Sequence, residues 1–290
     1  MSIRITRFGN LKLNLGECPV WDHAAERLWV MDCRAGRIFS LGGDGKAVLE
    51  AELEPPTGSF ALCRDGGLIV SRKETIVRLR DGKEEVLARI EESHPNMRLN
   101  DGSVLPDGSF AVGTMHVLRA EGEDPLGGLY LLGADGRFAK IGRALAVTNG
   151  PHVSPLDGRF YVCDSTPRVI LSYAMDADGV LCDERVFAQT EALGSAPDGC
   201  CFDTEGGLWT ALVHAGAIVR FAPDGTVSQK IDLPLAHPAS LCFGGPDFNE
   251  LYVTSISDSG RLKAEGELDG TVLRITGLGH QGFPSPLFAG

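Results

Sequence analysis

The chain has 290 residues, of which 43% are hydrophobic and 23% charged, and its formal net charge is −12. This composition is typical of a globular protein. The excess of acidic residues argues against a nucleic-acid-binding protein, because such binding requires clustered Lys and Arg. No stretch is long and apolar enough to span a membrane, and the first ten residues lack the apolar core of a signal peptide.

One short signal returns six times along the chain. A polar residue or a glycine stands four positions ahead of a residue expected to be buried, and a turn and a short apolar run follow. The leading positions, spaced by 41, 42, 49, 49 and 39 residues, are Glu17, Gly58, Asn100, Asn149, Asp198 and His237. A period of this length indicates a β-propeller or another repeat array.

Each repeat predicts four short strands joined by turns that contain Gly or Asp. The first repeat predicts strands at 20–21, 28–31, 38–41 and 47–49, and the fifth predicts strands at 201–202, 208–212, 217–221 and 227–233. Six such units predict an all-β protein, a six-bladed β-propeller with four-stranded antiparallel blades around a central channel. We expect one domain over residues 1–290, with blades starting near the six leading positions.

Two further segments are expected to complete this fold. The third repeat carries a polar insertion at 116–125, which predicts a loop that covers the central cavity. The N-terminal strand at 3–8 is expected beside 271–275, because an open sheet would leave an exposed edge.

The cysteines and histidines do not indicate a metal site of their own. There are eight cysteines without a Cys-x-x-Cys spacing, so we expect reduced thiols, no thiolate zinc site and a cytoplasmic protein. The seven histidines have no metal-ligand spacing, and His280 is expected in a surface loop.

The recurring polar position predicts a cation site. The first strand of each propeller blade lines the channel, so residues just ahead of it converge at one mouth. Two carboxylates and two amide oxygens would meet there, from Glu17, Asn100, Asn149 and Asp198. Such oxygen ligands suit Ca²⁺, Mg²⁺ or Mn²⁺ better than soft metals. The alternative stays open, because Asn149-Gly150, Asp198-Gly199 and Asn100-Asp-Gly102 are also ordinary turn sequences.

Several motifs resemble those of the gluconolactonase, regucalcin and luciferin-regenerating enzyme family, and they occur in order across nearly the whole chain. They are Gly16-Glu-Cys-Pro-Val-Trp21, Arg98-Leu-Asn-Asp-Gly102, Gly113-Thr-Met115, Thr148-Asn-Gly-Pro151, Pro197-Asp-Gly199, Leu208-Trp-Thr-Ala211 and Cys242-Phe-Gly-Gly-Pro-Asp247. The resemblance implies a six-bladed propeller with one divalent metal on its axis.

Carried over by motif, the resemblance implies that Glu17, Asn149 and Asp198 are the metal ligands. Asn100 would lie close to the metal, and Arg98 with Asn100 would bind the sugar ring. The metal would be Ca²⁺ first, with Zn²⁺, Mg²⁺, Mn²⁺ or Fe²⁺ as alternatives.

Two positions depart from the family pattern. Cys18 stands where members usually have glycine after the glutamate. Members often have an acidic residue after Gly-Thr-Met that touches substrate, whereas this chain has His116 there, with Glu121 and Glu123 further along the loop. We include His116 among the predicted substrate-binding residues.

The resemblance implies a divalent-metal-dependent hydrolase of carboxylic esters that opens a sugar lactone such as glucono-, xylono-, arabinono- or galactonolactone. Asp198 is the candidate catalytic residue, either as the base that accepts a proton from the attacking water or only as a metal ligand. The alternatives are a calcium-binding protein without catalysis and a hydrolase of other esters or organophosphates. The expected partner is the small-molecule lactone, and no protein partner is evident.

Overall fold

The computed structural model describes residues 2–290, and strands joined by turns and loops make up nearly all of its regular secondary structure. It contains strands β1 to β24 and one short 3-10 helix, η1 (Glu191–Leu193). The strands form six four-stranded sheets, and every pairing within them is antiparallel. This confirms the predicted fold class, an all-β, six-bladed β-propeller with four-stranded antiparallel blades.

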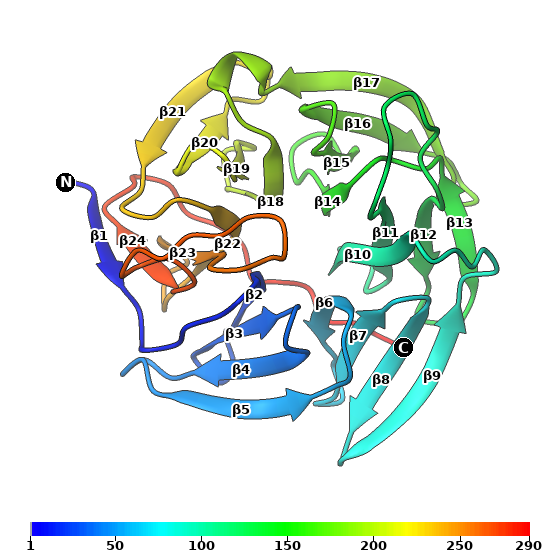
Figure 1. Cartoon of the computed structure of the whole chain (residues 1–290), viewed down its shortest axis with the longest axis horizontal. Coiled ribbons are helices and arrows are strands. Elements are labelled where there is room, and N and C mark those ends of the chain that lie inside the picture. The colour runs from blue at the N-terminus through cyan, green and yellow to red at the C-terminus, as the bar shows by residue number, and fades with distance from the viewer. Residues whose placement is uncertain (1) are drawn as a thin grey trace. The chain divides into compact units, whose positions relative to one another are not determined.

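The chain divides into two compact units. Unit 1 comprises the chain up to Glu54 together with Thr190–Ser285, and unit 2 comprises Pro55–Gln189 and Pro286–Gly290. Each unit holds three sheets, and within a sheet neighbouring strands mostly follow one another in chain order (Figure 1).

The strands of unit 1 make up three sheets. They are β2 (Gly16–Asp22), β3 (Arg27–Asp32), β4 (Arg37–Leu41) and β5 (Ala47–Glu52); β18 (Pro197–Phe202), β19 (Leu208–Leu212), β20 (Ala217–Phe221) and β21 (Val227–Asp232); and β22 (Pro238–Gly244), β23 (Glu250–Ser255), β24 (Leu273–Thr276) and β1 (Arg4–Arg7).

The strands of unit 2 make up the other three. They are β6 (Thr57–Leu62), β7 (Leu68–Arg72), β8 (Thr75–Arg80) and β9 (Lys83–Arg89); β10 (Met97–Val104), β11 (Phe110–His116), β12 (Leu129–Leu132) and β13 (Phe138–Gly142); and β14 (Thr148–Val153), β15 (Phe160–Asp164), β16 (Val169–Met175) and β17 (Leu181–Gln189).

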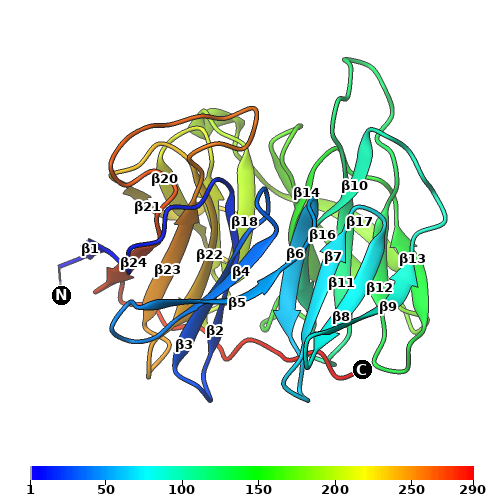
Figure 2. The same cartoon turned by 60° about the horizontal axis from the view of Figure 1, so that its bottom comes forward.

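The N-terminal strand completes the last sheet of unit 1. β1 pairs with β24 in an antiparallel ladder that runs from Arg4 opposite Thr276 to Arg7 opposite Leu273. The four strands of this sheet lie side by side in both ribbon views (Figures 1 and 2). The predicted pairing of the N-terminal strand with the segment at 271–275 is therefore confirmed, and it gives β24 a hydrogen-bonded neighbour on each side.

The apolar cores lie between neighbouring sheets of each unit. In unit 1 the indole of Trp21 stacks on Tyr252 with ring centroids 5.5 Å apart, and Trp209 is fully buried. In unit 2 the fully buried side chains include Phe110 and Phe160. Large aromatic side chains of this kind supply much of the area that a blade interface buries.

The C-terminal segment adds a further anchor to unit 2. Phe288 is 2% exposed and packs with the apolar residues around Phe110. Its backbone accepts a hydrogen bond from Arg64 and donates one to Leu62, at 2.9 Å each.

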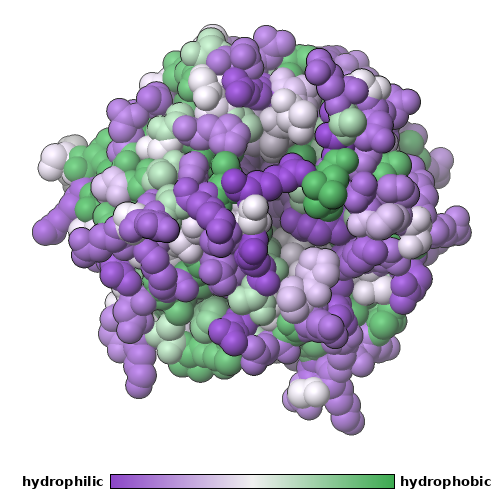
Figure 3. All heavy atoms as spheres, viewed as in Figure 1, coloured by the Kyte–Doolittle hydropathy of each residue, from purple (hydrophilic) through white to green (hydrophobic). Residues whose placement is uncertain are grey.

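Hydrophilic residues predominate on the face shown in Figure 3, and hydrophobic ones occur there in small groups. All eight cysteines carry free thiols within residues 2–290, and Cys182 on β17 is the exposed one. No helix in this range is long and apolar enough to cross a membrane.

Candidate functional site

In each of the six sheets, the strand that begins the repeat (β2, β6, β10, β14, β18 or β22) has a β-bulge. The ladder to the second strand shifts register between Glu17 and Val20 in β2, between Leu99 and Gly102 in β10, and between Asn149 and His152 in β14. The same shift occurs in β6, β18 and β22. A bulge leaves residues out of the ladder and turns their side chains in new directions, and bulges are common beside active sites.

The recurring position therefore lies inside the first strand in five repeats, and only His237 stands ahead of its strand, β22. The prediction that the polar residues stand just before the first strand of each blade is wrong for these five positions. The alternative that they form turns is also wrong for Asn100–Gly102, Asn149–Gly150 and Asp198–Gly199. All three segments belong to strands. The bulge explains the turn-like sequence, because it places Gly150 at φ 54°, a conformation that glycine adopts without steric cost.

The same geometry explains the departure at Cys18. This residue follows Glu17 at the bulge of β2 and has φ 48°, in the left-handed region that L-residues rarely occupy. The glycine that the family usually has at this place suits that conformation.

In unit 2 the bulges of β10 and β14 bring two predicted site residues into contact. The Nδ2 of Asn100 donates hydrogen bonds to the Oδ1 of Asn149, at 3.0 Å, and to the carbonyl oxygen of Thr148, at 2.8 Å. On its other side the Nδ2 of Asn149 donates to the Oγ of Ser165 at 2.8 Å. The amide of Asn149 is thus bonded at both ends, and its residue is only 5% exposed.

A buried carboxylate fixes the backbone beside this pair. Asp101 is 7% exposed, and its two oxygens accept hydrogen bonds from the backbone nitrogens of Gly102, at 2.8 Å, and Gly150, at 2.6 Å. Burial lowers the pKa of the nearby His152 imidazole, and the negative charge of Asp101 opposes that shift.

The register of β10 and β11 separates Arg98 from His116. Arg98 pairs with Met115 and Met97 pairs with His116, so the side chains of Arg98 and His116 point to opposite faces of this ladder. Arg98 donates to the carbonyl oxygen of Leu99 at 3.0 Å. The imidazole of His116 is 3% exposed and lies beside the loop that follows β11. Substrate contact by either residue stays a prediction.

In unit 1 the other two predicted ligands lie on β2 and β18. Asp198 is 8% exposed, and Glu17 is partly buried. The Oγ1 of Thr210 donates to the carbonyl oxygen of Asp198 at 3.2 Å, which holds the bulged segment against β19. Among residues 2–290 no group of three or more His, Cys, Asp and Glu side chains is placed to hold a metal. The predicted ligand set contains only two acidic residues and one amide, and it stays a prediction.

Two residues at the end of β15 were missed by the sequence analysis. The carboxylate of Asp164 accepts hydrogen bonds from the backbone nitrogens of Ala146 and Val147, at 3.2 and 3.1 Å, and Ser165 contacts Asn149. The carboxylate of Asp32, at the end of β3, likewise accepts hydrogen bonds from the backbone nitrogens of Asn14 and Leu15, just ahead of β2. The available signal was an Asp at the same place in two repeats, Met31-Asp-Cys33 and Cys163-Asp-Ser165.

Comparison with known proteins agrees with the motifs. Residues 15–257 match the family model described as SMP-30/Gluconolactonase/LRE-like region. The chain is 33% identical to regucalcin of Xenopus laevis over 302 residues, covering 100% of this chain and 99% of that protein. It is 34% identical over 283 residues to 6-deoxy-6-sulfogluconolactonase of Pseudomonas putida, covering 95% of each.

Solved structures give the same result for the fold. A luciferin-regenerating enzyme structure matches with a TM-score of 0.87 and 26% identity over 99% of both chains. A calcium-binding regucalcin from Agrobacterium tumefaciens matches with a TM-score of 0.85 and 23% identity, covering 97% of this chain and 96% of the other. The family resemblance read from the motifs is confirmed, and the chain belongs to the SMP-30/gluconolactonase/LRE family.

Proposed function

We propose that this protein hydrolyses a sugar lactone to the aldonic acid in a reaction that depends on one divalent cation. The relative named 6-deoxy-6-sulfogluconolactonase supports this reaction class, since it is 34% identical over 95% of both chains. The observation on which the proposal chiefly rests is that the carboxylate and amide residues sit at bulges of the first strands, where a strand can present a side chain outside its ladder.

The proposed ligands are Glu17, Asn149 and Asp198, with Ca²⁺ as the first candidate metal. The regucalcin structure described as calcium-binding supports that choice by analogy. Two carboxylates and one amide oxygen suit a cation that prefers oxygen ligands. The hydrogen bond from Asn100 shows which end of the Asn149 amide carries the oxygen that would bind the cation. A bound divalent cation supplies Lewis-acid polarisation of the lactone carbonyl and lowers the pKa of water.

The remaining residues are proposed to bind and orient the lactone. The Arg98 guanidinium offers several fixed donors for ring hydroxyls or for the developing oxyanion. Asn100 has its Nδ2 committed to Thr148 and Asn149, which leaves its carbonyl end for the sugar. Asp198 is proposed to accept the proton of the attacking water.

A second candidate is a calcium-binding protein without catalysis. It is favoured by the 33% identity to regucalcin over 100% of the chain. A third is a hydrolase of other esters or organophosphates, which would need an aromatic-lined pocket in place of polar groups such as Arg98 and Asn100.

The deciding experiment is a panel of neutral aldonolactones and a sulfonated gluconolactone, assayed by acid release. The protein is stripped with a chelator and each divalent ion is then restored. Rapid turnover of one or more sugar lactones that disappears on chelation and returns with a single metal is expected. Metal binding without turnover of any lactone would favour the calcium-binding alternative, and turnover unaffected by chelation would overturn the metal dependence.

A further inference from the structure

A three-residue hydrogen-bond chain crosses two sheets of unit 2. It runs from Asn100 on β10 through Asn149 on β14 to Ser165, just beyond β15. The two links are 3.0 and 2.8 Å long, and Asn100 and Asn149 are 49 residues apart. The first hydrogen bond joins β10 to β14, and the second joins β14 to the residue after β15. The three residues therefore meet through the packing and pairing of strands and not through local sequence.

These hydrogen bonds determine which end of the Asn149 amide is the oxygen. The two ends of an amide have nearly the same shape, so their placement depends on the hydrogen bonds that they make. Asn100 can only donate toward Asn149, since the same Nδ2 also donates to the carbonyl oxygen of Thr148 at 2.8 Å. A flipped Asn149 would set two donors against each other at this contact.

Ser165 satisfies the opposite end of the same amide. Asn149 pairs with Cys163 in the ladder, so Ser165, two residues beyond Cys163, lies on the same face of the sheet as Asn149. Its backbone is held in place, because its nitrogen donates to the carbonyl oxygen of Val147 at 3.1 Å. Without the hydroxyl, the Nδ2 of the nearly buried Asn149 would lose this acceptor, and a buried donor without its acceptor is costly.

We propose that Ser165 is a positioning residue that holds the Asn149 amide with its oxygen aimed for cation binding. The proposal rests on the proposed function, in which Asn149 is a metal ligand. Ser165 contacts neither the cation nor the lactone in this role; it acts only through Asn149. Outer partners that orient a metal ligand in this way commonly contribute 10- to 100-fold to metal affinity or activity.

The test measures cation affinity directly. Metal-free wild-type protein and variants are titrated with Ca²⁺ and Mn²⁺ by isothermal calorimetry, with circular dichroism as the check on folding. The Ser165→Ala variant should bind about tenfold more weakly. Ser165→Thr, which keeps the hydroxyl, should restore the affinity, and Ser165→Cys, with its weaker acceptor, should fall between the two.

A matched control lies in the same sheet. The Oγ of Ser154, beyond the other end of β14, accepts a hydrogen bond from the backbone nitrogen of Leu156 at 3.2 Å. Ser154→Ala removes the same group and should leave cation affinity unchanged. In an Asn149→Ala background, Ser165→Ala should cause no further loss, because its effect passes through Asn149.

The outcomes separate this inference from the proposed function. If the wild-type protein binds neither cation, the proposed metal site and the role of Ser165 both fail. If the wild-type protein binds a cation and Ser165→Ala binds it equally well, only the positioning role is overturned. A loss with Ser165→Ala that persists undiminished in the Asn149→Ala background would also overturn that role.

Discussion

The Oε2 of Glu123 lies 3.8 Å from the Nε2 of His116, although the two residues belong to different parts of the third repeat. His116 ends β11, and Glu123 lies in the loop between β11 and β12, which extends beyond the sheet (Figure 2). The same Oε2 accepts a hydrogen bond from the backbone nitrogen of Ala120 at 2.8 Å. The loop thus brings a carboxylate close to His116.

We predict that Glu123→Ala loosens this loop. The carboxylate is 54% exposed, so its contacts contribute on the order of 1 kcal/mol or less. Amide hydrogen exchange over residues 117–124 should therefore speed up by no more than about fivefold. Glu121→Ala, an exposed position on the same loop, is the matched control and should change exchange little. Equal exchange in both variants would show that Glu123 does not hold the loop.

The two predicted acidic ligands can be tested with substitutions that keep their shape. Glu17→Gln and Asp198→Asn each remove one negative charge, so metal-dependent lactone hydrolysis should fall by at least about a hundredfold in kcat/KM. Circular dichroism should still report a folded β-protein. Asp44→Asn, in an exposed turn, serves as the control. An unchanged rate in either test variant would remove that residue from the mechanism.

Arg98 is predicted to distinguish sugar lactones from simple ones. Hydrogen bonds from a charged group are worth about 1.5–3 kcal/mol, so Arg98→Ala should lower kcat/KM on aldonolactones by roughly 10- to 100-fold. An unsubstituted lactone, which lacks ring hydroxyls, should be affected much less. Arg98→Lys keeps the charge but not the fork of donors and should restore activity only in part. Equal losses on both substrates would mean that Arg98 does not bind the sugar hydroxyls.

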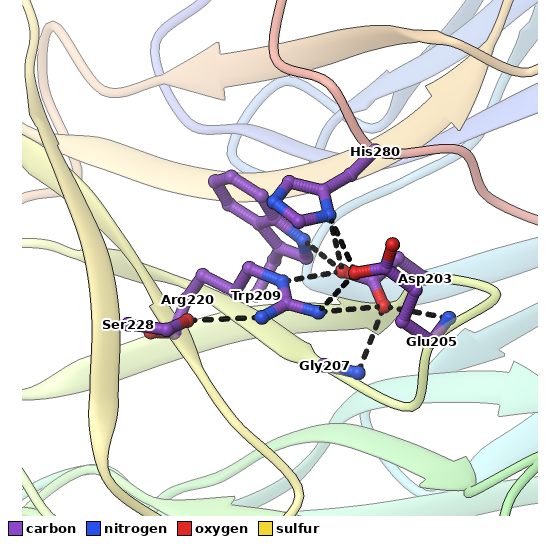
Figure 4. Close-up of polar contacts among 7 residues, drawn as sticks. All are labelled: Asp203, Glu205, Gly207, Trp209, Arg220, Ser228 and His280. Carbon is purple, nitrogen blue, oxygen red and sulfur yellow. Dashed lines mark hydrogen bonds and ion pairs between the residues drawn. The ribbon is translucent and has the colours of Figure 1, made fainter.

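A buried ion pair in unit 1 predicts the response of the fold to acid (Figure 4). Arg220 donates from Nε to the Oδ2 of Asp203 at 2.6 Å, and the indole of Trp209 donates to the same oxygen at 2.8 Å. Burial by itself would raise the pKa of Asp203, but the hydrogen bonds from Arg220, Trp209 and Gly207 hold it below 3.8. A lowered pKa stabilises the folded state above the unfolded value near 4, and this stabilisation is lost as the pH falls through the folded value.

We therefore predict that Asp203→Asn costs about 3 kcal/mol of unfolding free energy near pH 7, because it leaves the buried Arg220 without its main counter-charge. The difference from wild type should shrink as the pH falls below about 4. Denaturant unfolding at several pH values measures both effects. Asp247→Asn, an exposed position in unit 1, should change stability little at any pH. A cost that does not depend on pH would show that the charge of Asp203 is not what stabilises the fold.

His280 lies in a loop after β24, as the sequence predicts, and its side chain is 20% exposed. Its ring centroid lies 5.7 Å from that of Trp209, and its Nδ1 is 3.0 Å from Glu205 and 3.8 Å from Asp203 (Figure 4). The sequence around His280 is rich in glycine and polar residues, so local pattern alone favours a loop. The packing of this loop beside Trp209 on β19 half-buries the His280 side chain and sets it next to the buried Asp203, which the local pattern does not predict.

The sequence alone determined the number of repeats, the four strands of each and the family. These follow from periodic patterns that repeat every 39 to 49 residues and need no knowledge of packing. It also indicated that β1 pairs with β24, since a strand without a partner would leave an exposed edge.

Only the tertiary structure decided where the polar residues of each repeat lie and what they contact. A bulge depends on how two strands register, so the sequence could not place Asn149 inside β14 instead of in a turn. The contacts of Asn149 with Asn100 and Ser165, and of Arg220 with Asp203, join residues 16 to 49 positions apart. Such hydrogen bonds require a particular packing of strands and sheets, which a repeating pattern of residue types does not specify.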